Sequence, residues 1–172
     1  FKQKTAYEIP KRDWSSDVCS SDLSGTTYAG SIFLKKAAGS PDWMQVAFST
    51  IGLAGFANFN LTSGTVGNVL AGCTGRIENY GNGWYRCTLI QTATASGTSG
   101  GPVAVFVNNT NSATRYLSYA GNTSTSIYVF GAQLETGSVA TSYIPTTTAA
   151  VTRNADVISL SGAVSGCIGQ TE

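Results

Sequence analysis

Apolar and polar residues alternate along most of the chain from Ser24 onward, and short turn-forming segments separate the alternating stretches. Met44, Val46 and Phe48 share one face of the stretch 43–48, as the two-residue repeat of a β-strand requires. No segment has a helical repeat. About seven or eight such stretches with turns between them predict an all-β fold, a two-layer antiparallel β-sandwich of the jelly-roll kind.

The predicted strand at 126–135 is rich in apolar residues on both of its faces. One face is expected to carry Tyr128, Phe130, Ala132 and Leu134. The other is expected to carry Ile127, Val129, Gly131 and Gln133. Because both faces look largely buried, we expect this strand in the middle of a sheet and not at an edge.

A β-hairpin is predicted over 76–90, because Asn82-Gly83 lies between two alternating stretches. Its structural residues are expected to be Trp84, Tyr85 and Arg86. A two-residue turn would place Tyr80 opposite Tyr85, whereas a longer loop would shift that register. The faces of Trp84 and Tyr85 therefore stay open, and Arg86 either stacks on the Trp84 indole or pairs with Glu78.

The first 23 residues differ from the rest of the chain. The segments 2–9 and 13–23 resemble the translation of the two arms of a sequencing-library adapter, in one frame and in order. We therefore exclude residues 1–23 from the fold and expect them to be disordered. The native part is then expected to be an N-terminally truncated fragment of metagenomic origin.

Further boundaries follow from changes in composition. Residues 24–146 are expected to form the sandwich. Residues 147–155 read as a linker with low charge and no core pattern. Residues 156–172 contain one new strand pattern and are expected to begin a following, truncated domain.

Composition excludes several classes of function. Charged residues make up 11% of the chain and the net charge is +1, so nothing favours binding to nucleic acid or an anionic membrane. No apolar run approaches the roughly 20 residues that a membrane span needs. The absence of histidine removes the Ser-His-Asp and Cys-His triads and most zinc sites. The four cysteines have no C-x-x-C spacing, and a Cys73–Cys87 disulfide rests on proximity alone.

The acids within the predicted sandwich are Asp42, Glu78 and Glu135. Each lies next to a turn or a strand end, where solvated carboxylates are ordinary, and no pair with catalytic spacing is indicated. We therefore predict that the protein is not an enzyme, with a glycosidase fragment as the less favoured alternative. No cofactor is predicted, and the metal content stays open: calcium could bind through Glu135 or loop carbonyls, but no site is singled out.

Trp43 is the leading candidate for a ligand contact. It lies opposite the core face of its strand and next to a turn, where exposed aromatic rings often stack on sugars. The alternative is that Trp43 covers a sheet edge or packs under a loop. Tyr116 is the second candidate, and Gln45 shares the Trp43 face and offers an amide for hydrogen bonds.

Four motifs occur in the same order as in a known family. They are 24–28 with 33–36, 60–66, 81–87 and 131–146. Together they resemble a module of phage tail-fibre and other virion surface proteins, which is similar to jelly-roll carbohydrate-binding domains. The resemblance covers roughly residues 24–156. Residues 156–172 resemble the start of a lectin-like domain, and a strand segment that usually precedes 24–28 is missing.

This resemblance implies a non-catalytic module that binds host-surface glycan. It also implies an extracellular location on the virion, in the phage tail, and assembly with other tail-fibre chains, expected to form a homotrimer. Within that family the 81–87 hairpin and the 131–134 strand look structural, which favours contacts elsewhere. The alternative is a structural or oligomerisation spacer of a tail protein that binds no sugar.

Overall fold

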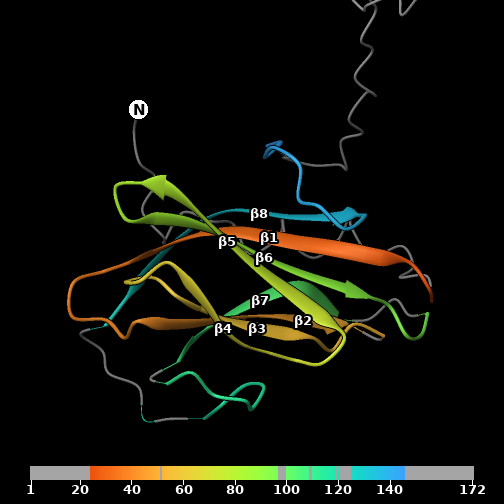
Figure 1. Cartoon of the computed structure of the whole chain (residues 1–172), viewed down its shortest axis with the longest axis horizontal. Helices are drawn as coiled ribbons and strands as arrows, with labels where there is room; N and C mark the ends of the chain where they lie inside the picture. Colours follow the sequence, from red (N-terminus) through yellow and green to blue (C-terminus); the bar gives the residue numbers. More distant parts are fainter. Residues whose placement is uncertain are drawn as a thin grey trace, which may run out of the picture.

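The computed structural model describes residues 24–50, 52–96, 100–108, 110–118, 120 and 125–145. These residues form two four-stranded antiparallel sheets that pack face to face (Figure 1). The strands are β1 (Thr27–Lys36), β2 (Trp43–Thr50), β3 (Phe56–Asn60), β4 (Thr65–Val69), β5 (Cys73–Gly81), β6 (Trp84–Thr92), β7 (Gly100–Asn108) and β8 (Ile127–Thr136). The predicted two-layer β-sandwich is confirmed. The predicted leader, linker and following domain lie outside the described residues.

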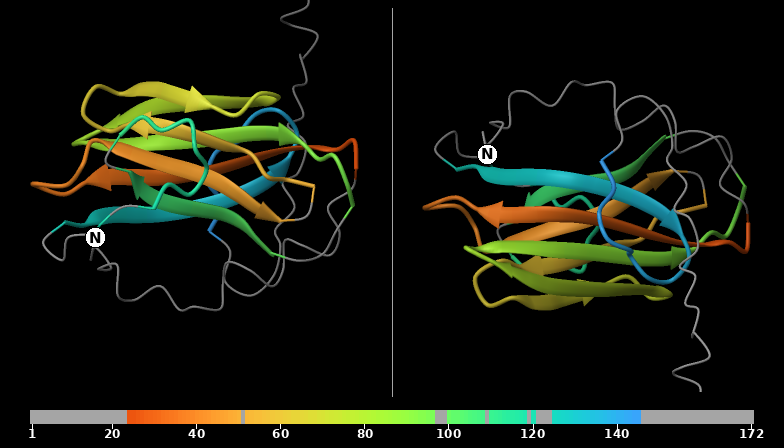
Figure 2. Two further views of the ribbon diagram at one scale, coloured as in Figure 1. Left: turned by 90° about the horizontal axis from the view of Figure 1, so that it is seen from below. Right: turned by 90° about the horizontal axis from the view of Figure 1, so that it is seen from above.

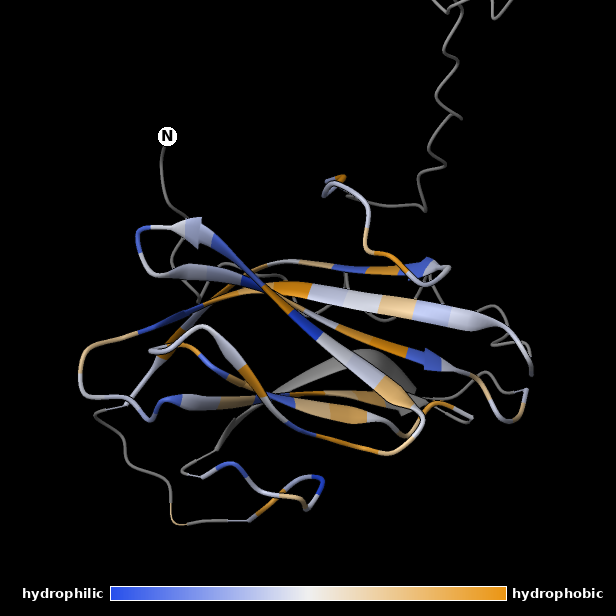
Figure 3. Ribbon diagram, viewed as in Figure 1, coloured by the Kyte–Doolittle hydropathy of each residue, from blue (hydrophilic) through white to orange (hydrophobic). Residues whose placement is uncertain are grey.

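One sheet has the strand order β5-β6-β1-β8 and the other has the order β4-β3-β2-β7. The core between them is filled by side chains from one face of β1 to β6 and from β8. Met44, Val46 and Phe48 of β2 are fully buried, as their alternation predicts. They meet the other sheet through the buried side chains Ile32, Leu34, Cys87 and Leu89. In Figure 3, β5 carries hydrophilic segments between short apolar ones, consistent with one solvent-facing side.

β8 lies at the edge of its sheet, with β1 as its neighbour among the described strands. The prediction of a central strand with two buried faces is therefore wrong. Tyr128 and Phe130 are 48% and 54% exposed. The residues of β8 that pack against the core are Ile127, Val129, Ala132 and Leu134.

A β-bulge explains this change of face. Gly131 and Ala132 lie together opposite Ile32, because the register shifts between Phe33–Phe130 and Ser31–Gln133. Gly131 has a φ of 59°, in the left-handed region that glycine enters without steric cost. The extra residue turns Ala132 away from the face that Phe130 occupies.

The predicted hairpin is present, with a two-residue turn at Asn82-Gly83. Both turn residues have positive φ, 51° and 78°, as a type I′ turn requires. The register differs from the simple expectation because Tyr80 is an extra residue in β5: Gly81 pairs with Trp84, and Asn79 pairs with Tyr85. This shift turns the Tyr80 ring to the outer surface of the sheet.

Cys73 and Cys87 are both free thiols, so the disulfide between them that proximity allowed is absent. Cys87 lies in the core opposite Ile77, whereas Cys73 lies at the start of β5 opposite Gln91. The hairpin register therefore places the two sulfur-bearing residues at different levels of the sheet.

Two non-strand segments lie across the outer surfaces of the sandwich (Figure 2). Loop 110–118 crosses the β4-β3-β2-β7 sheet and bonds to polar side chains of β2 and β3. Segment 137–145, which follows β8, folds back over the β5-β6-β1-β8 sheet and bonds to side chains of β8. Each segment covers part of one outer face. The candidate functional residues lie in or beside these two covered areas.

Candidate functional site

Loop 110–118 is held by two amide side chains on the outer face of the β4-β3-β2-β7 sheet. Gln45 and Asn58 are neighbours in the β2–β3 register and are fully buried. Gln45 Nε2 donates to Asn58 Oδ1 at 3.0 Å and to the Thr114 carbonyl at 3.2 Å. Asn58 Nδ2 donates to the Ser112 carbonyl at 2.6 Å. Buried amides are stable here because the loop backbone satisfies them.

The same loop reaches the outer face of β2, which carries two of the three predicted ligand contacts. Trp43 and Gln45 share the outer face of β2, and the Tyr116 amide donates to Gln45 Oε1 at 2.8 Å. Trp43 and Tyr116 are partly exposed, whereas the fully buried Gln45 amide is engaged with the loop. In the structure, Gln45 therefore positions Tyr116 and has no surface of its own from which to contact a ligand.

The Trp43 indole reaches across β3 to β4. A Cβ on Gly67 of β4 would lie 2.5 Å from Trp43 Cζ3 and would also meet the Asn111 side chain. Asn111 is in turn bonded to β4, because its Oδ1 accepts from the Asn68 amide at 2.7 Å. The indole therefore lies beside a glycine of β4 that the Asn111 side chain of the loop also approaches, and it is partly exposed.

Tyr116 has one side of its ring covered by its neighbour. The Arg115 guanidinium carbon lies 4.1 Å from the Tyr116 ring centroid, within the range of a cation–π contact. Arg115 and the Tyr116 hydroxyl both donate to the Phe48 carbonyl, the latter at 3.2 Å. Tyr116 also has a φ of 56°, which is uncommon for a residue with a side chain. These bonds fix the backbone conformation of Tyr116 within the loop.

A second cluster of aromatic side chains lies on the outer surface of the other sheet. We name this cluster the aromatic face, and it consists of Phe33, Tyr80, Tyr128, Phe130 and Tyr143. Phe33 lies at its centre: its ring centroid is 4.9 Å from that of Tyr80 and 5.9 Å from that of Phe130. Tyr80 is 56% exposed, and Tyr128 and Phe130 are about as open.

Segment 137–145 completes the aromatic face. The Tyr143 ring centroid is 5.2 Å from that of Phe130. A Cβ on Gly131 would lie 3.1 Å from Phe33 and 3.3 Å from Tyr143, so the absence of a side chain there lets the rings close together. The segment is held by two side chains of β8: Gln133 accepts from the Ile144 amide at 2.8 Å, and Glu135 accepts from the Thr141 amide at 2.9 Å.

Arg86 lies beside the aromatic face and is 3% exposed. Its guanidinium carbon is 5.4 Å from the Phe33 ring centroid, so it stacks on Phe33 and not on the Trp84 indole. Nη2 donates to Ser31 Oγ at 2.8 Å, while Nε is buried without a hydrogen-bond partner. The register places Glu78 opposite Arg86. The hairpin residue Tyr85 points to the core and Trp84 is partly buried.

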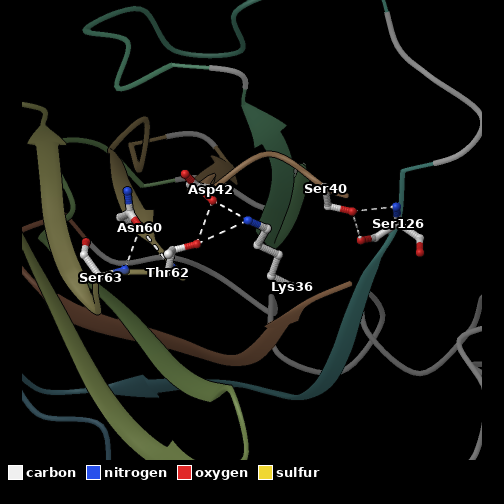
Figure 4. Close-up of polar contacts among 7 residues, drawn as sticks. All are labelled: Lys36, Ser40, Asp42, Asn60, Thr62, Ser63 and Ser126. Atoms are coloured by element: carbon white, nitrogen blue, oxygen red, sulfur yellow. Dashed lines mark hydrogen bonds and ion pairs between the residues drawn. The ribbon is translucent and has the colours of Figure 1, made fainter. Parts of the chain in front are cut away.

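The acids of the sandwich have separate surroundings. Figure 4 shows Asp42, which accepts from Lys36 in an ion pair and from the Thr62 hydroxyl at 2.6 Å. The bond from Lys36 is the main reason that the pKa of Asp42 lies below its ordinary value, and the bond from Thr62 adds to it. Glu135 is engaged with segment 137–145, and Glu78 is exposed. Within the described ranges, no three His, Cys, Asp or Glu side chains gather as metal ligands.

Figure 4 also shows how Ser40, before β2, is tied to the start of β8. Ser40 Oγ donates to the Ser126 carbonyl at 2.6 Å and accepts from the Ser126 amide at 2.9 Å. Ser40 and Asp42 therefore join loop ends of the two sheets. We interpret this polar cluster as structural, since its groups form their hydrogen bonds with one another.

Sequence reasoning pointed to Trp43, Gln45 and Tyr116 but not to the aromatic face. The signal that could have indicated it is Gly131, because a glycine inside an apolar strand often marks a bulge. No membrane-spanning helix is found in the part of the chain that the structure describes. No family model matches the chain, and no curated protein sequence matches it.

Proposed function

We propose that this chain is a non-catalytic module that binds glycan on the aromatic face. The observation that carries the proposal is the presence of three rings that are about half exposed, those of Tyr80, Tyr128 and Phe130, on one sheet surface. Aromatic rings stack on the apolar faces of sugar rings, and large exposed apolar patches usually mark binding sites.

The rings of the aromatic face are spread over β1, β5, β8 and segment 137–145, which suits an extended ligand. Phe33, Phe130 and Tyr143 pack together on the sheet, and Tyr80 adds a ring from the neighbouring hairpin. Because most of these residues stand on β-strands and their bulges, the rings are held by the backbone of the sandwich before any ligand arrives. A preformed platform avoids part of the entropy cost of binding.

The region of Trp43 and Tyr116 is the second location for the same function. Both side chains are partly exposed, and both lie on the outer side of the β4-β3-β2-β7 sheet, where loop 110–118 bonds to Gln45. Each ring has neighbours that cover part of it, the strand and loop for Trp43 and Arg115 for Tyr116. The aromatic face offers the larger open ring area, so we place the main contact there.

The resemblance of the motifs to tail-fibre modules supports a role on a phage tail, outside the cell, in recognition of host-surface glycan. Several weak sites on one fibre would give the avidity that a single site lacks. This part of the proposal rests on the sequence motifs, and the aromatic face supplies the surface that it requires.

A glycan array followed by titration calorimetry on the selected sugar tests the proposal. Phe130→Ala should weaken binding about fivefold, because one aromatic stack contributes about 0.5 to 1.5 kcal/mol. Leu70→Ala is the matched control, since Leu70 is an exposed apolar residue that follows β4 in the other sheet. Trp43→Ala decides between the two locations. The proposal would be contradicted if no sugar binds. It would also be contradicted if the Phe130→Ala variant and the Trp43→Ala variant both keep full affinity.

Assembly of several chains without sugar binding is the second candidate function. The edge position of β8 favours it, because among the described strands β8 has hydrogen bonds from one side only. An edge strand beside exposed rings such as Phe130 is suited to pairing with another chain. Light scattering coupled to size exclusion separates the candidates. A trimer that Phe130→Ala dissociates, with no glycan bound by either form, would favour assembly.

A further inference from the structure

Arg86 forms no ion pair with a carboxylate within the described residues. The ion pair there joins Lys36 to Asp42, on another part of the molecule. Glu78 lies opposite Arg86 in the register and forms no ion pair with it. Glu135 accepts from Thr141 and from Gln133. A nearly buried guanidinium therefore lies under the aromatic face with one bond, to Ser31.

Such an arrangement is costly unless something else stabilises the cation. A buried charge loses its hydration, and a buried N–H without an acceptor loses a hydrogen bond as well. The Phe33 ring offsets part of this loss through the cation–π contact. The Arg86 Nε–H remains without an acceptor. A buried cation with a donor that lacks an acceptor is suited to an anionic acceptor supplied from outside the chain. Arg115 Nε is another such donor, on the other sheet, but Arg86 alone lies beside the exposed rings of the aromatic face.

A second cation shares this surface. Lys35 follows the core residue Leu34 in β1, on the same side as Phe33, and it pairs with Tyr128 in the register. The exposed rings of Tyr128 and Phe130 thus lie next to the strand that carries Lys35 and next to Phe33, on which Arg86 stacks. The acids on the same face are Glu78, which lies opposite Arg86, and Glu135, which is bonded to Thr141 and Gln133.

We propose that the ligand of the aromatic face is an acidic glycan, one that carries a uronic-acid or sialic-acid carboxylate. The sugar rings stack on Tyr128 and Phe130, and the carboxylate pairs with Arg86, with Lys35 adding to the attraction. This inference rests on the proposed function. Because Arg86 is 3% exposed, binding of the carboxylate requires a side chain of the aromatic face to shift. Tyr80 is the candidate, since it is the extra residue of a bulge and is 56% exposed, while Phe33, Phe130 and Tyr143 stay packed. Charge and ring area together then select an anionic sugar over its neutral counterpart.

Matched pairs of probes test this selectivity. One pair is oligogalacturonate and its full methyl ester, and the other is sialyllactose and its methyl ester. Within a pair the sugar is the same and the carboxylate charge differs. We expect at least one pair in which the acid binds ten or more times more tightly than the ester. That ratio should fall as the salt concentration rises.

Variants assign the effect to Arg86. Arg86→Gln should remove most of the acid-to-ester ratio, with a small remainder from Lys35, and Arg86→Lys should retain a larger part of it because the charge remains. Arg76→Gln is the matched control, since Arg76 is an exposed arginine on the adjacent β5 strand. It should leave the ratio unchanged. Near-ultraviolet circular dichroism shows whether each variant is folded, and if Arg86→Gln is not, the Arg86→Lys ratio and the salt dependence decide.

The outcomes are distinct. Equal affinity for acid and ester, or a ratio that Arg86→Gln leaves intact, overturns the acidic-glycan inference while the proposed glycan binding stands. An acid-to-ester ratio that disappears in Arg76→Gln also overturns the inference, because the charge that selects the acid is then that of Arg76 and not that of Arg86. Failure of all four probes and of every sugar on the array overturns the proposed function and this inference with it.

Discussion

Gln45 and Asn58 face each other across β2 and β3 on the outer side of their sheet, and both are fully buried, with 3.0 Å between Nε2 and Oδ1. A polar pair on an outer face would normally be exposed to water. Here loop 110–118 takes the place of the solvent and bonds to both side chains. The loop and the pair therefore depend on each other.

Gln45→Leu should destabilise the protein by about 1 to 3 kcal/mol, because it removes the hydrogen bonds that join Gln45 to Asn58 Oδ1 and to the Tyr116 backbone amide. Freed from β2, the loop should also become accessible to trypsin at Arg115. Chemical denaturation and a proteolysis time course measure the two effects. Asn79→Ala serves as the control, since the Asn79 side chain is exposed and bonds within its own turn. Unchanged stability and unchanged cleavage at Arg115 would show that the amide pair does not hold the loop.

Gly131→Ala should destabilise the fold more than Gly25→Ala does. Both glycines have positive φ, so each alanine pays about 1 kcal/mol or more for the left-handed conformation. An added Cβ meets Phe33 and Tyr143 at Gly131 but meets nothing within 4 Å at Gly25. The difference between the two variants in thermal unfolding therefore reports the packing of the aromatic face. Equal destabilisation would mean that the rings adjust without cost.

Cys87 should resist alkylation in the folded protein, whereas Cys73 should react slowly. Burial raises the pKa of both thiols, and Cys87 is fully buried while Cys73 is partly accessible. The thiolate is the reactive form, so both effects act in the same direction. Iodoacetamide at pH 8 followed by peptide mapping measures each site. Labelling of Cys87 at the rate seen in denaturant would contradict the position of β6 in the core.

Lys36→Met should raise the pKa of Asp42 toward its ordinary value of 3.8. Because the folded-state pKa is lowered, this interaction stabilises the protein above the unfolded-state value, and its contribution is lost as the pH falls through the folded-state pKa. Carbon-13 NMR titration of the Asp42 carboxyl group measures the change directly. Lys35→Met is the matched control, because the ion pair at Asp42 is formed by Lys36. An unaltered Asp42 titration in Lys36→Met would exclude the ion pair as the cause.

Much of the fold was accessible from local pattern. The alternation of Met44, Val46 and Phe48 identified the core face of β2, and Asn82-Gly83 identified the hairpin turn. These features depend on neighbours in the chain, because side-chain direction repeats every two residues and turn conformation depends on the residues in the turn. β4 was not anticipated, since its segment has exposed and partly exposed residues without a clear apolar face.

The candidate sites depended on contacts between distant segments. Gln45 reads as a surface amide in sequence, and only a loop some 70 residues away buries it. Trp43 and Tyr116 were each identified by residue type, but the bond that ties Tyr116 to Gln45 of β2 follows from that same loop.

The sequence by itself determined the class of fold, the core face of its clearest strand and the hairpin turn, because these arise from short-range periodicity. The tertiary structure decided the edge position of β8, the bulge at Gly131 and the exposure of Phe130. An apolar strand looks the same in sequence whether its second face is covered or open. Which face is covered depends on strand order and packing, and these are set by the whole chain.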